Sequence, residues 1–269
     1  MKLYRKVNRL IKHLASYHIA LYAANASFYI FLSIFPAIML VVGILPHIGY
    51  SSEMLLRALR SVMPEVLMPL LEGVIRDMST NSSSTLLSLT AITAVWSASR
   101  GVYCIQLGLN AMHGVRESRN YILQRLLCML YTLFLIAALI LTLVLHGFGQ
   151  ELAGYLQRQE IPILRFLAKL LQFRGLILFL LLSALFTAMF CVFPNRKLSV
   201  RRSLPGAVLA ALGWLLFTMF FSIYVRFSGS YSLFYGSLSS IAIGMLWLYI
   251  CISILFYGCV FNLLLERRQ

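Results

Sequence analysis

Six long, unbroken apolar stretches dominate the sequence and restrict its possible folds more than any other feature. They cover approximately residues 20–45, 86–112, 126–148, 175–193, 204–225 and 237–265. A helix rises about 1.5 Å per residue and the hydrocarbon core of a bilayer is about 30 Å thick, so each stretch is long enough to cross a membrane. We therefore predict an all-α integral membrane protein with six transmembrane helices.

The composition agrees with this class. The chain is 61% hydrophobic and only 12% charged, whereas a soluble domain carries about 25% charged residues. A formal net charge of +15 suggests nucleic-acid binding only where the basic residues gather on one surface, and here they are spread over several short loops. We expect no nucleic-acid partner, and we interpret residues 1–269 as a single six-span membrane domain.

The distribution of charge predicts the orientation of the chain. Basic residues are more frequent in the loops that share one side with both ends of the chain, and six of the eight acidic residues lie on the opposite side: Glu53, Glu65, Glu72, Asp77, Glu151 and Glu160. Cytoplasmic loops carry an excess of lysine and arginine. We therefore expect a multi-pass protein with both termini in the cytoplasm.

Three segments outside the predicted spans have the spacing of amphipathic helices. Residues 1–18 form a basic cytoplasmic segment with apolar residues at helical spacing, which either recognises anionic lipids or anchors the topology. Residues 50–78 and 150–173 combine regularly spaced apolar residues with charges. We expect amphipathic helices in these two outer loops.

Small residues recur at spacings of three and four in the second, fifth and sixth predicted spans. In lipid, such stripes let helix backbones approach closely, so they mark helix–helix contacts. We predict that these three helices form a central bundle through Ser97, Gly101, Cys104, Gly108, Gly206, Ala210, Gly213, Ser240 and Gly244.

Arg100 is the only charged residue inside any of the six stretches. A charge at the centre of a spanning helix costs about 2.5–3.5 kcal/mol on insertion scales, so something must compensate it. Pro36 removes one hydrogen bond from the first span, which predicts a kink and frees backbone carbonyls. These carbonyls, hydroxyl groups, Asn110, Asn262, water or an anionic ligand are the candidate partners. Arg100 is either a contact for an anion or lipid phosphate or a structural arginine that caps carbonyls.

The sequence contains no recognisable catalytic or metal-binding constellation. The histidines are scattered, and there is no HExxH motif, no pair of carboxylates and no P-loop. The five cysteines lie within apolar stretches without a CxxC spacing, as packing residues do: Cys104, Cys128, Cys191, Cys251 and Cys259. We expect no enzymatic activity, no metal and no cofactor.

Four groups of residues, in this order along the chain, resemble the YihY/BrkB family of bacterial inner-membrane proteins. They are residues 23–36, with Ala23-Ala24-Asn25-Ala26-Ser27 and Pro36; residues 96–110, with Trp96-Ser97-Ala98-Ser99-Arg100-Gly101 and Leu109-Asn110; Leu204-Pro205-Gly206-Ala207; and Tyr235-Gly236-Ser237 leading to Trp247. The resemblance covers nearly the whole chain.

The resemblance implies a six-helix protein of the bacterial cytoplasmic membrane. Members of the family have been associated with envelope integrity and lipid export, and many carry a ribonuclease label that disagrees with this sequence. The family commonly has a glutamate near the end of its last span, where this chain has Val260 in Gly258-Cys259-Val260-Phe261-Asn262. That carboxylate is therefore excluded as a partner of Arg100.

Three functions remain open at this point. The first is a transporter or flippase-like handler of an anionic lipid or envelope precursor, in which Arg100, Asn110 and Tyr235 line the polar part of the substrate path and membrane lipids are the partners. The second is an envelope scaffold or assembly protein without transport, whose interior would be fully packed. The third is a membrane-embedded hydrolase, which requires a convergent nucleophile and base.

Overall fold

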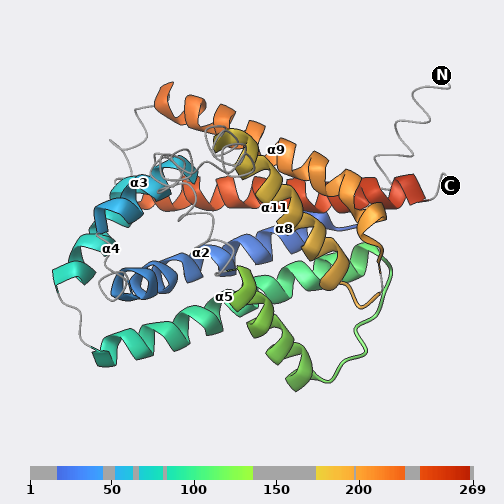
Figure 1. Cartoon of the computed structure of the whole chain (residues 1–269), viewed down its shortest axis with the longest axis horizontal. Helices are drawn as coiled ribbons and strands as arrows, with labels where there is room; N and C mark the ends of the chain where they lie inside the picture. The colour runs from blue at the N-terminus through green and yellow to red at the C-terminus, as the bar shows by residue number, and fades with distance from the viewer. Residues whose placement is uncertain are drawn as a thin grey trace, which may run out of the picture.

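The computed structural model describes residues 17–44, 52–62, 67–80, 84–135, 174–196, 198–227 and 237–266. Within these ranges the chain forms helices and no strand, which confirms the predicted all-α class. Figure 1 labels the helices α2 (Ile19–Ile44), α3 (Ser52–Val62), α4 (Met68–Thr80), α5 (Ser84–Met112), α8 (Arg174–Val192), α9 (Val200–Phe227) and α11 (Ser237–Glu266). A further helix covers Tyr121–Leu135.

Four helices are long and apolar enough to cross a membrane, over Ile19–Met39, Gly175–Val192, Val200–Val225 and Ser240–Glu266. α5 matches the second predicted span in extent, but its serines, threonines, amides and Arg100 make it less apolar. The third predicted span begins in the Tyr121–Leu135 helix, and its remainder lies outside the described residues. The protein therefore has several apolar helices of membrane-spanning length, and the count of six spans stays a prediction.

Several other predictions fall outside the described residues. These are the segment 1–16, the loop 150–173 and the loop that contains Tyr235. Pro36 lies within α2, whose helix continues to Ile44, but the side chain of Pro36 is also outside the described part of the chain. The predicted kink therefore stays a prediction.

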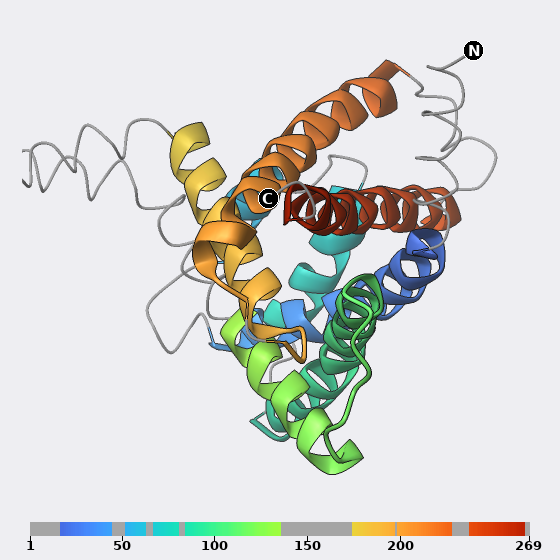
Figure 2. The ribbon, with the colours of Figure 1, turned by 90° about the vertical axis from the view of Figure 1, so that its right-hand side faces the viewer.

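α2 and α11 lie at the centre of the arrangement. α11 packs on α9 and α2, α2 packs on α5, and α8 covers α9, so that α5 and α9 flank the central pair on opposite sides (Figures 1 and 2). The predicted central bundle of the second, fifth and sixth spans is therefore wrong in one respect. The first span takes the central place that we predicted for the second, because α5 packs mainly on α2. Gly101 of α5 faces Ile30 of α2, whereas Gly108 faces both Phe256 of α11 and Tyr22 of α2.

α3 and α4 confirm the prediction of amphipathic helices in residues 50–78. Leu55 and Leu59 of α3 and Leu71 and Ile75 of α4 are buried, whereas Arg57 and Arg60 of α3 and Arg76 of α4 are exposed. Glu53 in the first turn of α3 and Arg60 in its last turn interact favourably with the helix dipole. The two helices cover one end of α2 and α11, and their apolar faces complete the core there.

Glycines set the closest helix contacts. A Cβ atom on Gly101 of α5 would collide with Ile30 of α2, and one on Gly206 of α9 would collide with the carbonyl oxygen of Gly258 in α11. A Cβ atom on Gly244 of α11 would collide with the side chain of Leu67, just before α4, and would lie 3.0 Å from Phe31 of α2. There is no hydrophobic driving force for helices to associate in lipid, so close backbone packing of this kind stabilises the helix contacts.

Asn262 of α11 joins α9 by two hydrogen bonds beside Pro205. The backbone N–H of Gly206 donates to Oδ1 of Asn262 at 2.7 Å, and Nδ2 of Asn262 donates to the carbonyl oxygen of Ser203 at 2.8 Å. Pro205 lies inside α9, where a proline disturbs the hydrogen bonds of the preceding turn. Asn262 therefore satisfies backbone groups of α9 next to this disturbance, and it does so as α11 approaches Gly206.

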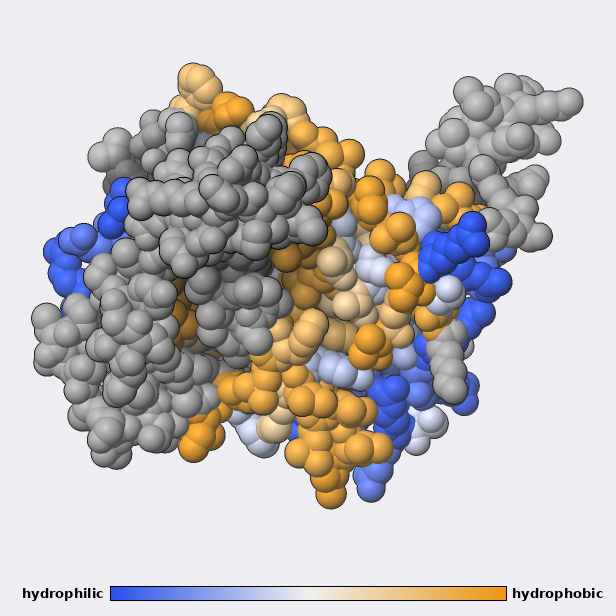
Figure 3. Space-filling model, viewed as in Figure 1, coloured by the Kyte–Doolittle hydropathy of each residue, from blue (hydrophilic) through white to orange (hydrophobic). Residues whose placement is uncertain are grey.

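The surface is divided into an apolar band and two hydrophilic ends (Figure 3). At the end away from α3 and α4, the 113–120 loop, Asn195, Arg196, Arg202 and Glu266 lie together, and we call this the polar end. Arg196 and Arg202 both pair with Glu266 at 3.3 Å, and Asn195 donates to Ser118 at 2.9 Å. An apolar band between two hydrophilic ends is the surface pattern of a protein that spans a bilayer.

Candidate functional site

A partly open pocket of about 340 Å³ lies beside the middle of α5. It is lined by Tyr29 from α2, by Arg100, Tyr103 and Cys104 from α5, and by Tyr121, Gln124 and Arg125 from the Tyr121–Leu135 helix. Ligand pockets in proteins have volumes of about 300–1,000 Å³. The pocket is therefore large enough for a small polar group, and its walls are mainly tyrosines and cations.

Arg100 lies in this pocket, and its side chain is exposed. Its guanidinium carbon is 5.7 Å from the centre of the Tyr29 ring, within the range of a cation–π contact. The neighbouring Gly101 packs against Ile30, so the contact between α5 and α2 places Arg100 next to Tyr29. Arg100 therefore lies at a cavity between α2, α5 and the Tyr121–Leu135 helix.

Arg125 is the residue that the sequence analysis missed. We began the third predicted span at residue 126 and so placed Arg125 in a cytoplasmic loop. The helix instead begins at Tyr121, and it carries Arg125 to the middle of α5. There the Arg125 guanidinium carbon lies 4.4 Å from the centre of the Trp96 ring, and Nη2 donates to the Trp96 carbonyl oxygen at 3.2 Å. The apolar residues Tyr121, Ile122 and Leu123 were the signal that the helix starts earlier.

Two hydrogen-bond donors of the pocket residues have no partner in the part of the chain that the structure describes. They are Nε2 of Gln124, a residue that is only 5% exposed, and Nε of Arg125. A buried donor without an acceptor costs about 1–3 kcal/mol. None of the described residues that line the pocket carries a carboxylate that could accept these bonds.

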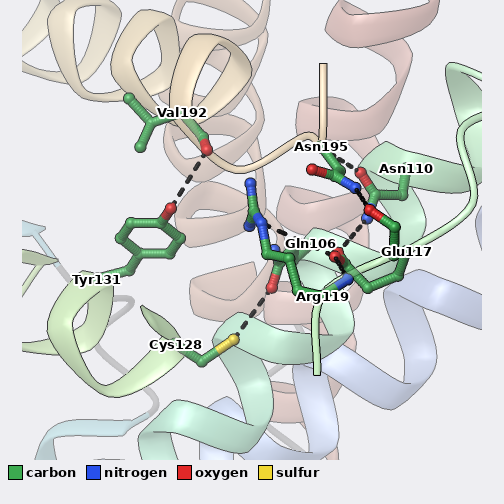
Figure 4. A network of polar contacts seen from close by, with 9 residues as sticks. Gln106, Asn110, Glu117, Arg119, Cys128, Tyr131, Val192 and Asn195 are labelled. Atoms are coloured by element: carbon green, nitrogen blue, oxygen red, sulfur yellow. Dashed lines mark hydrogen bonds and ion pairs between the residues drawn. The ribbon is translucent and has the colours of Figure 1, made fainter. Parts of the chain in front are cut away.

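Asn110 lies in a different site, a polar network at the polar end (Figure 4). Its Nδ2 donates to Oε2 of Glu117 at 2.9 Å, and its Oδ1 accepts from the backbone N–H of Asn195 at 2.8 Å. Arg119 lies 3.8 Å from Glu117. The network ties the end of α5 to the segment between α8 and α9, so Asn110 is not brought together with Arg100.

A second polar contact joins α5 to the Tyr121–Leu135 helix near this network. The thiol of Cys128 lies 3.1 Å from Oε1 of Gln106, and both residues are fully buried (Figure 4). Among the described residues, no three histidine, cysteine or acidic side chains lie close enough to hold a metal ion.

Comparison with known proteins gives a consistent identification. The family described as virulence factor BrkB matches residues 10–269. A protein of Bacillus subtilis that is named as ribonuclease-like, YfkH, is 30% identical over 251 residues, which is 92% of this chain and 90% of YfkH.

Shorter matches connect the chain to UPF0761 membrane proteins. One from Idiomarina loihiensis is 37% identical over 84 residues, or 31% of this chain and 30% of that protein. One from Vibrio vulnificus is 32% identical over 91 residues, or 34% of this chain and 29% of that protein. No solved structure matches significantly. The match over residues 10–269 confirms the resemblance found in the sequence, and the chain belongs to the BrkB family of membrane proteins.

Proposed function

We propose that this protein is a transporter or flippase-like handler of an anionic lipid or envelope precursor in the bacterial cytoplasmic membrane. The observation that carries the proposal is the pocket beside the middle of α5, in which Arg100 and Arg125 meet without a carboxylate. Two cations at this position in an apolar band are expensive unless a negative group joins them. Tyr235 would contribute to the polar part of the substrate path, and Asn110 would support that path through the network at the polar end.

The orientation is part of the same proposal. Both termini would lie in the cytoplasm, with six spans in all. In support, the polar end collects Arg116 and Arg119 from the 113–120 loop, Arg196 from the segment before α9 and Arg202 from the first turn of α9, as the positive-inside rule requires of a cytoplasmic side. A green fluorescent protein fused to the C-terminus should therefore fluoresce in intact cells, and an alkaline phosphatase fusion at the same point should be inactive. The reverse pair of results would contradict this orientation.

Reconstituted liposomes give the direct test of transport. The protein should accelerate the movement of a fluorescent anionic phospholipid between leaflets, and Arg100→Ala should reduce the rate roughly tenfold or more, because hydrogen bonds to a charged group contribute about 1.5–3 kcal/mol. Arg116→Ala removes an exposed charge outside the pocket and serves as the matched control. Wild-type protein that does not move the lipid, while Arg100→Ala lowers only the stability, would favour the scaffold function instead.

A further inference from the structure

The two guanidinium groups of the pocket are held in place by aromatic rings and one carbonyl. Arg100 lies over Tyr29, and Arg125 lies over Trp96 and donates to the Trp96 carbonyl oxygen. None of these partners carries a negative charge. Among the described residues, the two cations are therefore positioned without being neutralised, which is the arrangement of a preorganised anion site.

Gln124 gives an independent reason to place a ligand here. Its side chain lines the pocket and is only 5% exposed, and its Nε2 has no acceptor among the described residues. An amide that served only to fill space would be replaced at no loss by an apolar side chain of similar size. Nε of Arg125, a second residue of the pocket, also lacks a partner among the described residues, so two donors point to an acceptor group that arrives with a ligand.

The number and kind of donors favour a phosphoryl group over a carboxylate. A carboxylate has two oxygens, and one arginine can satisfy both of them in a bidentate pair. Here two arginines, one glutamine and the tyrosines Tyr29, Tyr103 and Tyr121 line one pocket. A phosphoryl group has more oxygens in a tetrahedral arrangement, and arginine is the usual partner for it in proteins.

The surroundings of the pocket favour a phosphoryl group that belongs to a lipid. The pocket lies beside the middle of α5, and Trp96, Tyr121, Ile122 and Leu126 next to it are all at least half exposed. In a bilayer these side chains would face acyl chains. A headgroup in the pocket could therefore keep its chains along this apolar surface, whereas free phosphate would have to cross it.

We infer that the pocket formed by Arg100, Gln124 and Arg125 binds the phosphoryl group of an anionic lipid. This inference rests on the proposed function, since it names the chemistry by which the substrate would be recognised. Arg100 and Arg125 bind the phosphoryl oxygens from two helices, and Gln124 donates to a further oxygen. The bound group satisfies the buried donors that are free in its absence.

Binding to the purified full-length protein in detergent tests the inference. The probes are fluorescent phosphatidic acid, diacylglycerol with the same chains, and the corresponding fatty acid, with inorganic phosphate as a competitor. Phosphatidic acid should bind roughly tenfold or more tightly than the other two lipids, because charged hydrogen bonds to its phosphoryl oxygens are lost in them. Competition by inorganic phosphate would show that the pocket also accepts the free ion, and its absence would show that the acyl chains are required.

Two variants separate recognition from folding. Arg125→Gln should weaken phosphatidic acid binding roughly tenfold, whereas Arg116→Gln, which removes the same charge outside the pocket, should leave it unchanged. Gln124→Met should also weaken binding, but it should not lower the melting temperature of the ligand-free protein, because Nε2 has no partner to lose. Equal binding by all three variants, or equal binding of the fatty acid, would overturn the inference.

The inference and the proposed function can fail separately. Wild-type protein that moves no lipid in liposomes, together with phosphatidic acid binding that is lost in Arg125→Gln, would remove the transport function and leave the phosphoryl site standing. Lipid movement that depends on Arg100, together with equal binding of lipids with and without a phosphoryl group, would support the transport function and overturn the phosphoryl site.

Discussion

Gly206→Ala should lower the free energy of unfolding by about 1–3 kcal/mol, the usual cost of overpacking a well-packed site. The added Cβ would collide with the carbonyl oxygen of Gly258 and would lie 2.6 Å from the side-chain amide of Asn262. A backbone atom cannot rotate away as a side chain can, so α9 and α11 must separate. Equilibrium unfolding in mixed SDS and detergent micelles measures the loss.

Gly73→Ala in α4 is the matched control for this substitution. A Cβ atom on Gly73 would have nothing within 4 Å, and alanine favours a helix over glycine by about 0.5–1 kcal/mol. The same chemical change should therefore leave the protein equally stable or slightly more stable. A Gly206→Ala variant that unfolds at the same SDS fraction as Gly73→Ala would show that α9 and α11 do not depend on this contact.

Asn262→Leu should be at least as damaging, with an expected loss of about 2–4 kcal/mol, because each buried group left without a partner costs about 1–3 kcal/mol. The substitution removes the hydrogen bonds to the Gly206 N–H and to the Ser203 carbonyl oxygen. Interhelical side-chain pairs in membranes average only about 0.6 kcal/mol. We expect the larger value because both partners of Asn262 are buried backbone groups of α9 beside Pro205.

Asn25→Leu provides the comparison for Asn262→Leu. Asn25 is exposed, and its Nδ2 donates to the Leu21 carbonyl oxygen within its own helix at 3.1 Å. Its replacement should change the unfolding free energy little, since no contact between helices is lost. Melting temperatures in detergent and unfolding in SDS should rank Asn262→Leu far below Asn25→Leu, and similar values for the two variants would contradict the role given to Asn262.

The sequence predicted the helices well because an apolar run and its polar borders are local features. The predicted stretch 20–45 corresponds to α2 (Ile19–Ile44), and 237–265 corresponds to α11 (Ser237–Glu266). Helix partners are not local. The stripe at Gly101 marks a close contact, but nothing in a stripe says which helix fills it, and Ile30 of α2 does so here. For this reason the first span, rather than the second, is central.

The candidate site was predicted only in part for a similar reason. Arg100 stands out because a cation inside an apolar stretch is visible in any sequence. Arg125 does not, since it lies at the border where a polar loop meets an apolar run, and a shift of the helix start by a few residues carries it from the loop to the pocket. Asn110 and Asn262 were considered as partners for Arg100, but their amides bond to other backbone and carboxylate groups instead.

The contact between Gly101 and Ile30 limits how the protein can move. Arg100 and Tyr29 are the sequence neighbours of these two residues, so the cation and its ring are registered against each other by the tightest approach of α5 to α2. Sliding α5 along α2 would break that approach. A shift of α5 along α2 would therefore also separate Arg100 from the Tyr29 ring.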